Sequence, residues 1–277
     1  MSWLETTGMP NLRNPVALLA FAGWGDAGES STGAAQEYLT ALEGEVFARI
    51  DPDEFFEFQA RRPVIHMDDG IRHISWPRNE FHALHHPQGD LVVLLGEEPQ
   101  LRWRAFCELI AGVLHDLEVT RAVTMGAFLG QVPHSLPVPL IGAAADAKLL
   151  LASGLPASGY QGPTGIVGVL TNHLAESGIN TVSTWAAVPH YLGTQRYPPG
   201  IAALVYKSGE LLDRRLDTSA LDESAERFRS SVDGALDESQ DLREYVERLE
   251  TAYEDDEGET EDPAALVDEI ERYLKDR

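Results

Sequence analysis

The sequence has few of the residues on which several kinds of function depend. Its 277 residues include a single cysteine, Cys107, which excludes an intramolecular disulfide framework. The 21 basic residues, only three of them lysine, are outnumbered by 45 acidic residues, for a net charge of −24. A chain this acidic is repelled by phosphate backbones and by anionic lipid headgroups. We therefore expect no nucleic-acid partner and no membrane partner.

Long apolar runs are also missing. The longest, such as residues 16–22, fall far short of the roughly 20 residues that cross a bilayer. Residues 1–14 are polar and interrupted by Pro10, unlike the charged and apolar regions of a secretory signal. These absences predict a cytoplasmic protein.

Common signatures of catalysis do not occur either. The sequence has no glycine-rich phosphate loop with a lysine, no nucleophile elbow and no metal-ligand spacing. His82, His85 and His86 lie close together, but their spacing is loose and lacks a nearby cysteine or acid pair. We interpret that segment as the end of a surface helix, and we expect no metal and no cofactor.

Short apolar runs that alternate with helical patterns predict a layered α/β fold. Strands are expected at residues 16–22, 45–50, 91–95, 122–127, 140–144 and 180–188, of which 16–22 and 91–95 have the continuous apolar character of buried strands. Helices are expected at 32–42, 101–117 and 164–177. Such alternation forms βαβ units, which place helices on both faces of a mainly parallel sheet. Two further runs joined by Asp68-Asp69-Gly70 predict a hairpin, as an insertion or an antiparallel edge. The predicted fold is a three-layer α/β/α sandwich.

The character of the chain changes after Pro199. Residues 201–212 and 219–253 have helical spacing, with a slip near Gly234. Residues 209–277 carry 24 acidic and 9 basic residues, which is more than half of the net charge. We predict an α/β/α core at residues 1–199, a helical appendage at 200–253, a disordered acidic linker at 254–262 and a terminal helix at 263–277.

The loop after the first strand is a candidate ligand site. Its sequence, GWGDAGES, lies between a strand end and a helix, where open α/β sheets bind their ligands. A helix N-terminus attracts anions, but Asp26 and Glu29 would oppose a phosphate there. Ser30, Ser31 and Thr32 are more simply explained as helix caps. Both interpretations stay open from the sequence.

His134 and His190 each follow a predicted strand and a proline. A histidine in a cleft near an acid such as Asp146 or Glu97 is suited to act as a general base. The alternative is structural, with the imidazole bonded to the backbone of a Pro-His turn. No serine or cysteine stands in a nucleophile context beside either histidine.

A ligand site at this end of the sheet would also draw on the glycine- and proline-rich loop that begins at Tyr160. The catalytic candidates are Asp26, His134, Asp146 and His190, and the binding candidates are Gly23, Asp26, Glu29, Glu97, Tyr160, Gly162 and Thr164.

Four segments together resemble the PAC2 family, the proteasome assembly chaperone 2-like proteins, in their actinobacterial form. They are FAGWGDAGESSTGA (21–34), LVVLLGEEPQLRWRAF (91–106), GAFLGQVPHSLPVP (126–139) and the block from GPTGI to WAAVPHYL (162–192). Their order and joint presence carry the resemblance, which covers most of the chain. It implies a core with the topology of nucleoside phosphorylases, a helical C-terminal appendage and a homo-oligomer, either a dimer or a trimer.

The resemblance also implies a function. Eukaryotic relatives are chaperones for the proteasome α-ring and archaeal relatives engage the proteasome, so proteasome subunits are the expected protein partner. Archaeal-type docking through a hydrophobic-Tyr-any tail is not expected, because this sequence ends Lys275-Asp276-Arg277. The first prediction is a non-catalytic, chaperone-like scaffold with its acidic C-terminal helices as a contact segment. The alternative is an enzyme or small-ligand binder for nucleosides or anionic metabolites, with its site at the strand ends.

Overall fold

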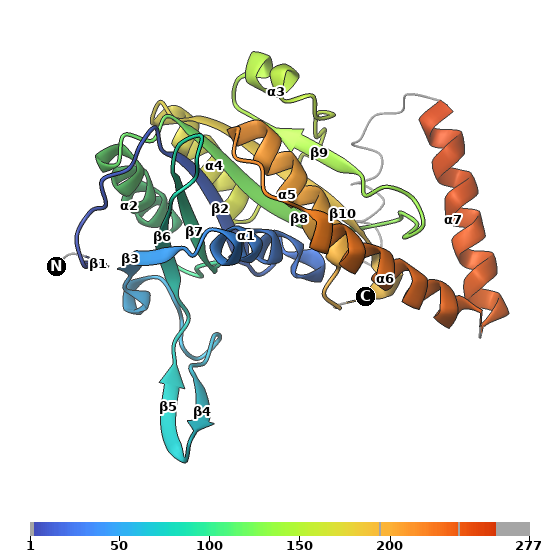
Figure 1. Cartoon of the computed structure of the whole chain (residues 1–277), viewed down its shortest axis with the longest axis horizontal. Coiled ribbons are helices and arrows are strands. Elements are labelled where there is room, and N and C mark those ends of the chain that lie inside the picture. The colour runs from blue at the N-terminus through green and yellow to red at the C-terminus, as the bar shows by residue number, and fades with distance from the viewer. Residues whose placement is uncertain (1–2, 194, 238, 259–277) are drawn as a thin grey trace.

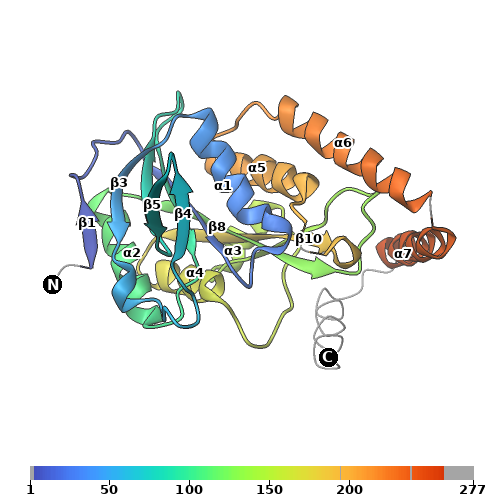
Figure 2. The same cartoon turned by 90° about the horizontal axis from the view of Figure 1, so that it is seen from below.

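The computed structural model describes residues 3–193, 195–237 and 239–258. Within them, one large sheet is covered by helices on both faces, and a hairpin projects from the body (Figures 1 and 2). The expected terminal helix at 263–277 and the second part of the expected linker lie outside the described residues.

The large sheet has a parallel centre and antiparallel edges. In spatial order its strands are β1 (Leu4–Thr6), β3 (Glu45–Ile50), β6 (Asn79–Leu84), β7 (Leu91–Glu97), β2 (Val16–Ala22), β8 (Arg121–Gly130), β10 (Asn180–Pro189) and β9 (Leu140–Ala143). Neighbours from β7 to β10 are parallel, and the outer pairs are antiparallel. The central strands are buried along most of their length, as strands covered on both faces are.

Two helix pairs complete the three layers. On one face lie α1 (Ser30–Ala41) and α5 (Pro198–Leu212), and on the other α2 (Trp103–Asp116) and α4 (Ile166–Glu176). Each pair encloses its own apolar cluster against the sheet. Cys107 on α2 is fully buried, and burial raises the pKa of its thiol to about 12, which keeps it protonated and unreactive. The predicted α/β/α fold is confirmed.

The predicted surface-helix end at His82 is wrong, because residues 79–84 form strand β6. The segment NEFHAL has no β-branched residue, so its own preference for a strand is weak. Antiparallel pairing with β3 on one side and β7 on the other decides its conformation. His82 is therefore buried within the sheet, and burial lowers the pKa of its imidazole.

The C-terminal helices divide differently from the expected segments. Ile201, Leu204 and Leu212 of α5 are buried in the core, so the boundary expected after residue 199 falls within a core helix. The slip near Gly234 precedes a break between α6 (Ser219–Leu236) and α7 (Gln240–Gly258). The first residues of the expected linker continue α7, because extending a helix costs far less than starting one. A short helix that the pattern did not predict, α3 (Ala147–Ser153), follows β9.

The hairpin is the predicted one. It consists of β4 (Val64–Asp68) and β5 (Ile71–Ser75), which form a two-stranded sheet separate from the large one. Asp69 and Gly70 have φ values of 47° and 78°, as a two-residue turn matched to the twist of the strands requires. The hairpin is thus an insertion between β3 and β6.

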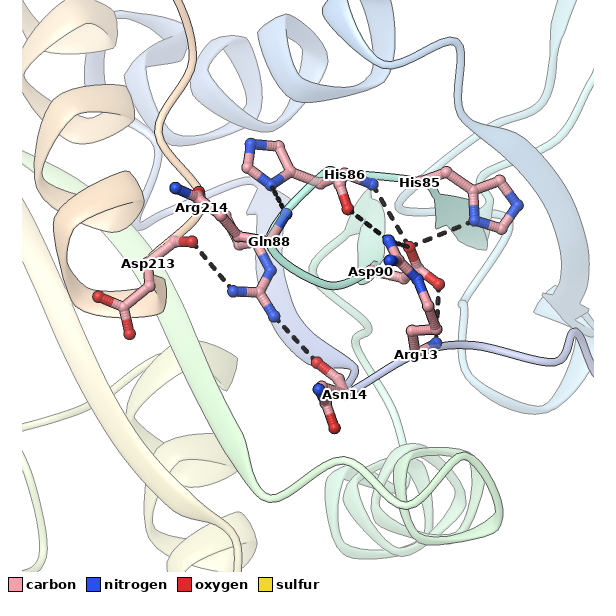
Figure 3. A network of polar contacts seen from close by, with 8 residues as sticks. All are labelled: Arg13, Asn14, His85, His86, Gln88, Asp90, Asp213 and Arg214. Atoms are coloured by element: carbon pink, nitrogen blue, oxygen red, sulfur yellow. Dashed lines mark hydrogen bonds and ion pairs between the residues drawn. The ribbon is translucent and has the colours of Figure 1, made fainter.

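A buried polar network fastens the amino ends of the central strands to the end of α5 (Figure 3). The carboxylate of Asp90, which is 2% exposed, accepts hydrogen bonds from the backbone N–H groups of Arg13 (2.7 Å) and His86 (3.4 Å). Arg214, which is 3% exposed, donates to the carbonyl oxygen of Asn14 (3.0 Å). The segment before β2, the turn before β7 and the chain after α5 are thereby held together.

The network gives the protein a pH-dependent contribution to its stability. Burial alone would raise the pKa of Asp90, but hydrogen bonds from Arg13, His85 and His86 outweigh it and lower the pKa. A carboxyl with a lowered pKa stabilises the fold above its unfolded-state value of about 3.9. That contribution is lost as the pH falls through the lower, folded-state pKa.

We predict that Asp90→Asn lowers the free energy of unfolding by about 1–3 kcal/mol near neutral pH. The further decline of that free energy below about pH 4 should also be shallower in the variant. Urea denaturation across this pH range measures both effects. The control is Asp116→Asn at an exposed position, which should change stability by less than about 0.5 kcal/mol. Wild-type stability and acid response in Asp90→Asn would contradict the role of the network.

Candidate functional site

The carboxyl ends of β2 and β8 mark the place where an open α/β sheet usually binds a ligand. These two strands pair only from Ala17 to Leu19 of β2, and they then diverge. After β2 the chain continues to β3 toward one edge of the sheet, and after β8 it continues to β9 at the opposite edge. The topology therefore places a crevice here.

The loop that follows β2 fills this crevice. The backbone N–H of Ala127 in β8 donates to the carbonyl oxygen of Gly25 at 2.7 Å, and Asp26 forms an isolated bridge with Ala127. Trp185 of β10 lies against Gly25 of this loop, and a Cβ atom on Gly126 of β8 would come within 2.4 Å of its indole. The absence of a side chain at Gly126 thus allows the indole of Trp185 to occupy the crevice.

Asp26 caps the N-terminus of α1. One carboxylate oxygen accepts hydrogen bonds from the backbone N–H groups of Ser31 (2.8 Å) and Thr32 (3.1 Å) and from the Ser31 hydroxyl (2.6 Å). The other accepts the hydroxyl of Thr32 at 2.5 Å. The capping group is therefore the aspartate, whereas the sequence favoured the serines and the threonine. This helix N-terminus already holds an anion of its own chain.

Glu98 caps the N-terminus of α4 in the same way. Its carboxylate accepts the backbone N–H of Ile166 at 2.7 Å and that of Trp24 at 3.3 Å. The hollow beside it, between Phe21 and Trp185, leaves no space for a water-sized molecule. Both helix N-termini beside the crevice are thus occupied by carboxylates of the protein.

Sequence reasoning missed Glu98 and selected its neighbour Glu97. Glu97 is instead joined to Arg61 in an ion pair. The signal for Glu98 is spatial, because its carboxylate lies against Gly23 and Gly165 from two other loops. That arrangement exists only once β2 and β7 have paired.

The remaining predicted ligand residues form hydrogen bonds with nearby backbone groups or are exposed to solvent. Asp146 caps α3 through the backbone N–H of Lys148 at 2.8 Å, and the hydroxyl of Tyr160 donates to the carbonyl oxygen of Pro163 at 2.7 Å. The exposed candidates are Gly23, Glu29, Gly162 and Thr164. No group of three or more His, Cys, Asp or Glu side chains in the described part of the chain is placed to hold a metal ion.

The two candidate histidines do meet, in a cluster with two tyrosines that we call the histidine–tyrosine cluster: His134, His190, Tyr191 and Tyr245. Tyr191 packs edge-on against His134, His190 and Tyr245, with ring centroids 5.7–6.2 Å apart. Tyr245 comes from α7, and Asp233 of α6 bonds His134 Nε2 at 3.0 Å. The cluster therefore joins the loops after β8 and β10 to the two C-terminal helices.

Both ring nitrogens of each histidine have a partner. His190 Nδ1 lies 3.0 Å from the carbonyl oxygen of Gly130, which only accepts, so Nδ1 carries the proton and Nε2 accepts the Tyr245 hydroxyl at 2.8 Å. His134 Nδ1 bonds the Tyr191 hydroxyl at 2.7 Å. Burial raises the pKa of Tyr191, which keeps that hydroxyl neutral and able to donate. Such fully engaged imidazoles fit the structural interpretation, since a general base needs a nitrogen within reach of a substrate.

Comparisons with known proteins agree with this structure. The PAC2 family model matches residues 20–236. The chain is 36% identical to a PAC2 family protein of Streptomyces avermitilis, with coverage of 84% of this chain and 99% of that chain and a TM-score of 0.76. The chain belongs to the PAC2 family.

Two further relatives extend the comparison. A proteasome-assembly chaperone homologue of Mycobacterium tuberculosis is 34% identical, with coverage of 83% of this chain and 99% of that chain and a TM-score of 0.78. PbaB of Pyrococcus furiosus, an archaeal proteasome activator, shares the fold at 16% identity, with coverage of 84% and 97% and a TM-score of 0.63. No curated protein matches the chain.

The PAC2 segments coincide with the filled crevice. The first of them contains Asp26, the second contains Glu98 and the third contains His134. The family match ends at the last residue of α6, so α7 lies beyond it. No helix in the described ranges is both long enough and apolar enough to cross a membrane.

We predict that Tyr245→Phe loosens α7 and leaves the core of this PAC2 protein intact. The change removes the hydroxyl that bonds His190 and keeps the aromatic ring. One lost hydrogen bond of about 1 kcal/mol corresponds to roughly fivefold faster hydrogen exchange in residues 240–253. Mass spectrometry measures that exchange, with Tyr206→Phe on the exposed surface of α5 as the matched control. Wild-type exchange of α7 in Tyr245→Phe would show that the bond does not hold the helix.

Proposed function

We propose that this PAC2 protein is a non-catalytic, chaperone-like scaffold of the cytoplasm that associates with itself and binds proteasome subunits. The observation that carries the proposal is the filled crevice at the strand ends. Asp26, Glu98 and Trp185 occupy the space in which an enzyme of this architecture would hold its substrate. A protein with that site closed acts through its surface.

The relatives support the choice of partner. The Mycobacterium tuberculosis relative, a proteasome-assembly chaperone homologue, is aligned over nearly its whole length. Archaeal proteins of the same fold include a proteasome activator and a homologue of the proteasome-assembly chaperone. Similarity of fold alone does not fix function, so the choice of partner rests first on the Mycobacterium tuberculosis relative at 34% identity.

Trp24 is the residue most suited to anchor a protein partner. It is 61% exposed, although it lies on a loop that Asp26 and Glu98 fix on either side. The carboxylate of Glu98 accepts the backbone N–H of Trp24 itself. A large aromatic side chain on a preorganised backbone loses little freedom on binding, and such residues dominate the energy of protein interfaces.

The alternative, a nucleoside or anionic-metabolite site in the same loops, has less support. Its two candidate anion sites are capped by Asp26 and Glu98, and both ring nitrogens of His134 and of His190 are engaged. A carboxylate at a helix N-terminus repels an incoming anion at the same position.

Affinity purification tests the proposal. We expect the tagged full chain to enrich proteasome α-ring subunits from the cytosol of its own organism, relative to an untagged control. Trp24→Ala should weaken binding to the purified subunits at least about tenfold, as loss of an interface anchor does. The matched control is Tyr206→Ala, another exposed aromatic residue, which should bind normally. Failure to enrich any proteasome subunit would refute the proposed partner.

A further inference from the structure

The hairpin has a large apolar surface that no other segment of the described residues covers. We call residues 61–78, which contain β4 and β5, the arm (Figure 1). All ten residues of its two strands are exposed. A two-stranded hairpin on its own is marginally stable in water, and exposed strand edges promote association.

The apolar side chains are concentrated on one face of the arm. Because Ile65 pairs with Ile74 and Met67 pairs with Arg72, these side chains lie on the same side of the ribbon, together with Trp76 two residues after Ile74. Ile65, Met67, Ile74 and Trp76 are between 47% and 67% exposed. We call these four residues the apolar face of the arm. The opposite face is more polar and carries the cross-strand pair of His66 and His73.

The apolar face continues into a cleft at the base of the arm. The cleft has a volume of about 340 Å³, and Ile74 and Trp76 form part of its wall. On the side of the main sheet the cleft is lined by the carboxylates of Glu5, Asp51 and Glu80, and Glu80 is paired with Arg49. Trp76 is fixed at this junction by Phe58, with ring centroids 4.8 Å apart. The arm and the cleft thus form one continuous surface.

The charge of the arm differs in sign from that of the chain. The arm contains four arginines and two aspartates, a net charge of +2, whereas the whole chain carries −24. Two copies of so acidic a protein repel one another over most of their surfaces. The electrostatic cost is lowest where the positively charged arm of each copy lies against the acidic body of the other.

We infer that the apolar face of the arm and the cleft at its base are the contact between two copies of this chain. This inference rests on the self-association included in the proposed function, and it assigns the surface responsible. The four apolar residues offer on the order of 400 Å² of exposed surface, or about 800 Å² over two copies, so burial of the cleft residues must supply the remainder of the roughly 1,200 Å² of a specific interface.

A two-fold arrangement uses this surface on both copies at once, as most dimers do. Two arms that lie antiparallel place the tip of each beside the base of the other. Arg72, near the tip, is then brought toward the carboxylates of Glu5 and Asp51 in the cleft of the second copy. The apolar faces cover one another along the arms.

Sedimentation velocity of the full-length protein tests the inference over a range of micromolar concentrations. We expect the wild type to associate, and Ile65→Thr/Ile74→Thr to raise the dissociation constant about a hundredfold or more. Threonine keeps the β-branched side chain that suits a strand, so the hairpin itself is preserved. Arg72→Glu should raise the constant about tenfold.

Two control variants change the same chemistry outside the arm. Leu151→Gln alters an apolar residue that is 83% exposed on α3, and Arg104→Glu reverses an exposed charge on α2. Both should associate like the wild type. An oligomeric wild type with equally oligomeric arm variants would overturn the assignment of the surface while leaving self-association intact. A monomeric wild type would overturn the inference together with the proposed self-association, whether or not proteasome subunits bind.

Discussion

The carboxylate of Asp26 is the contact on which the structure at the carboxyl ends of the central strands depends. It accepts four hydrogen bonds from the first turn of α1, and its own backbone is paired with β8. The loop after β2 is thereby held between two strands that would otherwise leave an open crevice. Glu98 repeats the arrangement at the start of α4. One simple device, a carboxylate at a helix N-terminus, both closes the crevice and orders the loop that exposes Trp24.

Polar contacts of the protein's own side chains also hold the C-terminal helices in place. His134 and His190 would be suspected of catalysis in an open site, but here each imidazole connects a core loop to a later helix. Buried polar groups that are fully satisfied fix one arrangement of the elements they join. The acidic α6 and α7 are thus held beside the crevice rather than left as an independent tail. We therefore assign the proposed interactions to exposed features, namely Trp24 and the arm, rather than to the crevice.

The sequence predicts the layers of the fold well, because burial on both faces leaves a direct trace in runs such as residues 16–22 and 91–95. The hairpin can also be predicted from the sequence, since Asp69 and Gly70 adopt the backbone conformation that its turn needs. Strand β6 cannot be predicted in this way, because pairing with β3 and β7 decides its conformation. The helix α5 resembles an appendage in the sequence, and only its burial against the sheet assigns it to the core.

For the candidate site, the sequence identifies several of the residues but not their roles. Asp26, His134 and His190 are identifiable as polar residues at strand ends, and the PAC2 segments identify the family. Their roles are not identifiable, because Asp233 lies 99 residues from His134 and Glu98 bonds a residue 68 positions away. Such partners are chosen by the packing of the sheet and its helices. Local pattern therefore locates the site, while long-range contacts decide whether it is open.

The crevice at the strand ends is closed by side chains of the protein itself. Ligand-observed NMR with the full-length protein tests this closure, using inorganic phosphate and a panel of nucleosides at millimolar concentration. We expect no saturable binding by any of these probes. Saturable binding that is altered by Asp26→Ala or Glu98→Ala would show instead that the crevice opens to ligands.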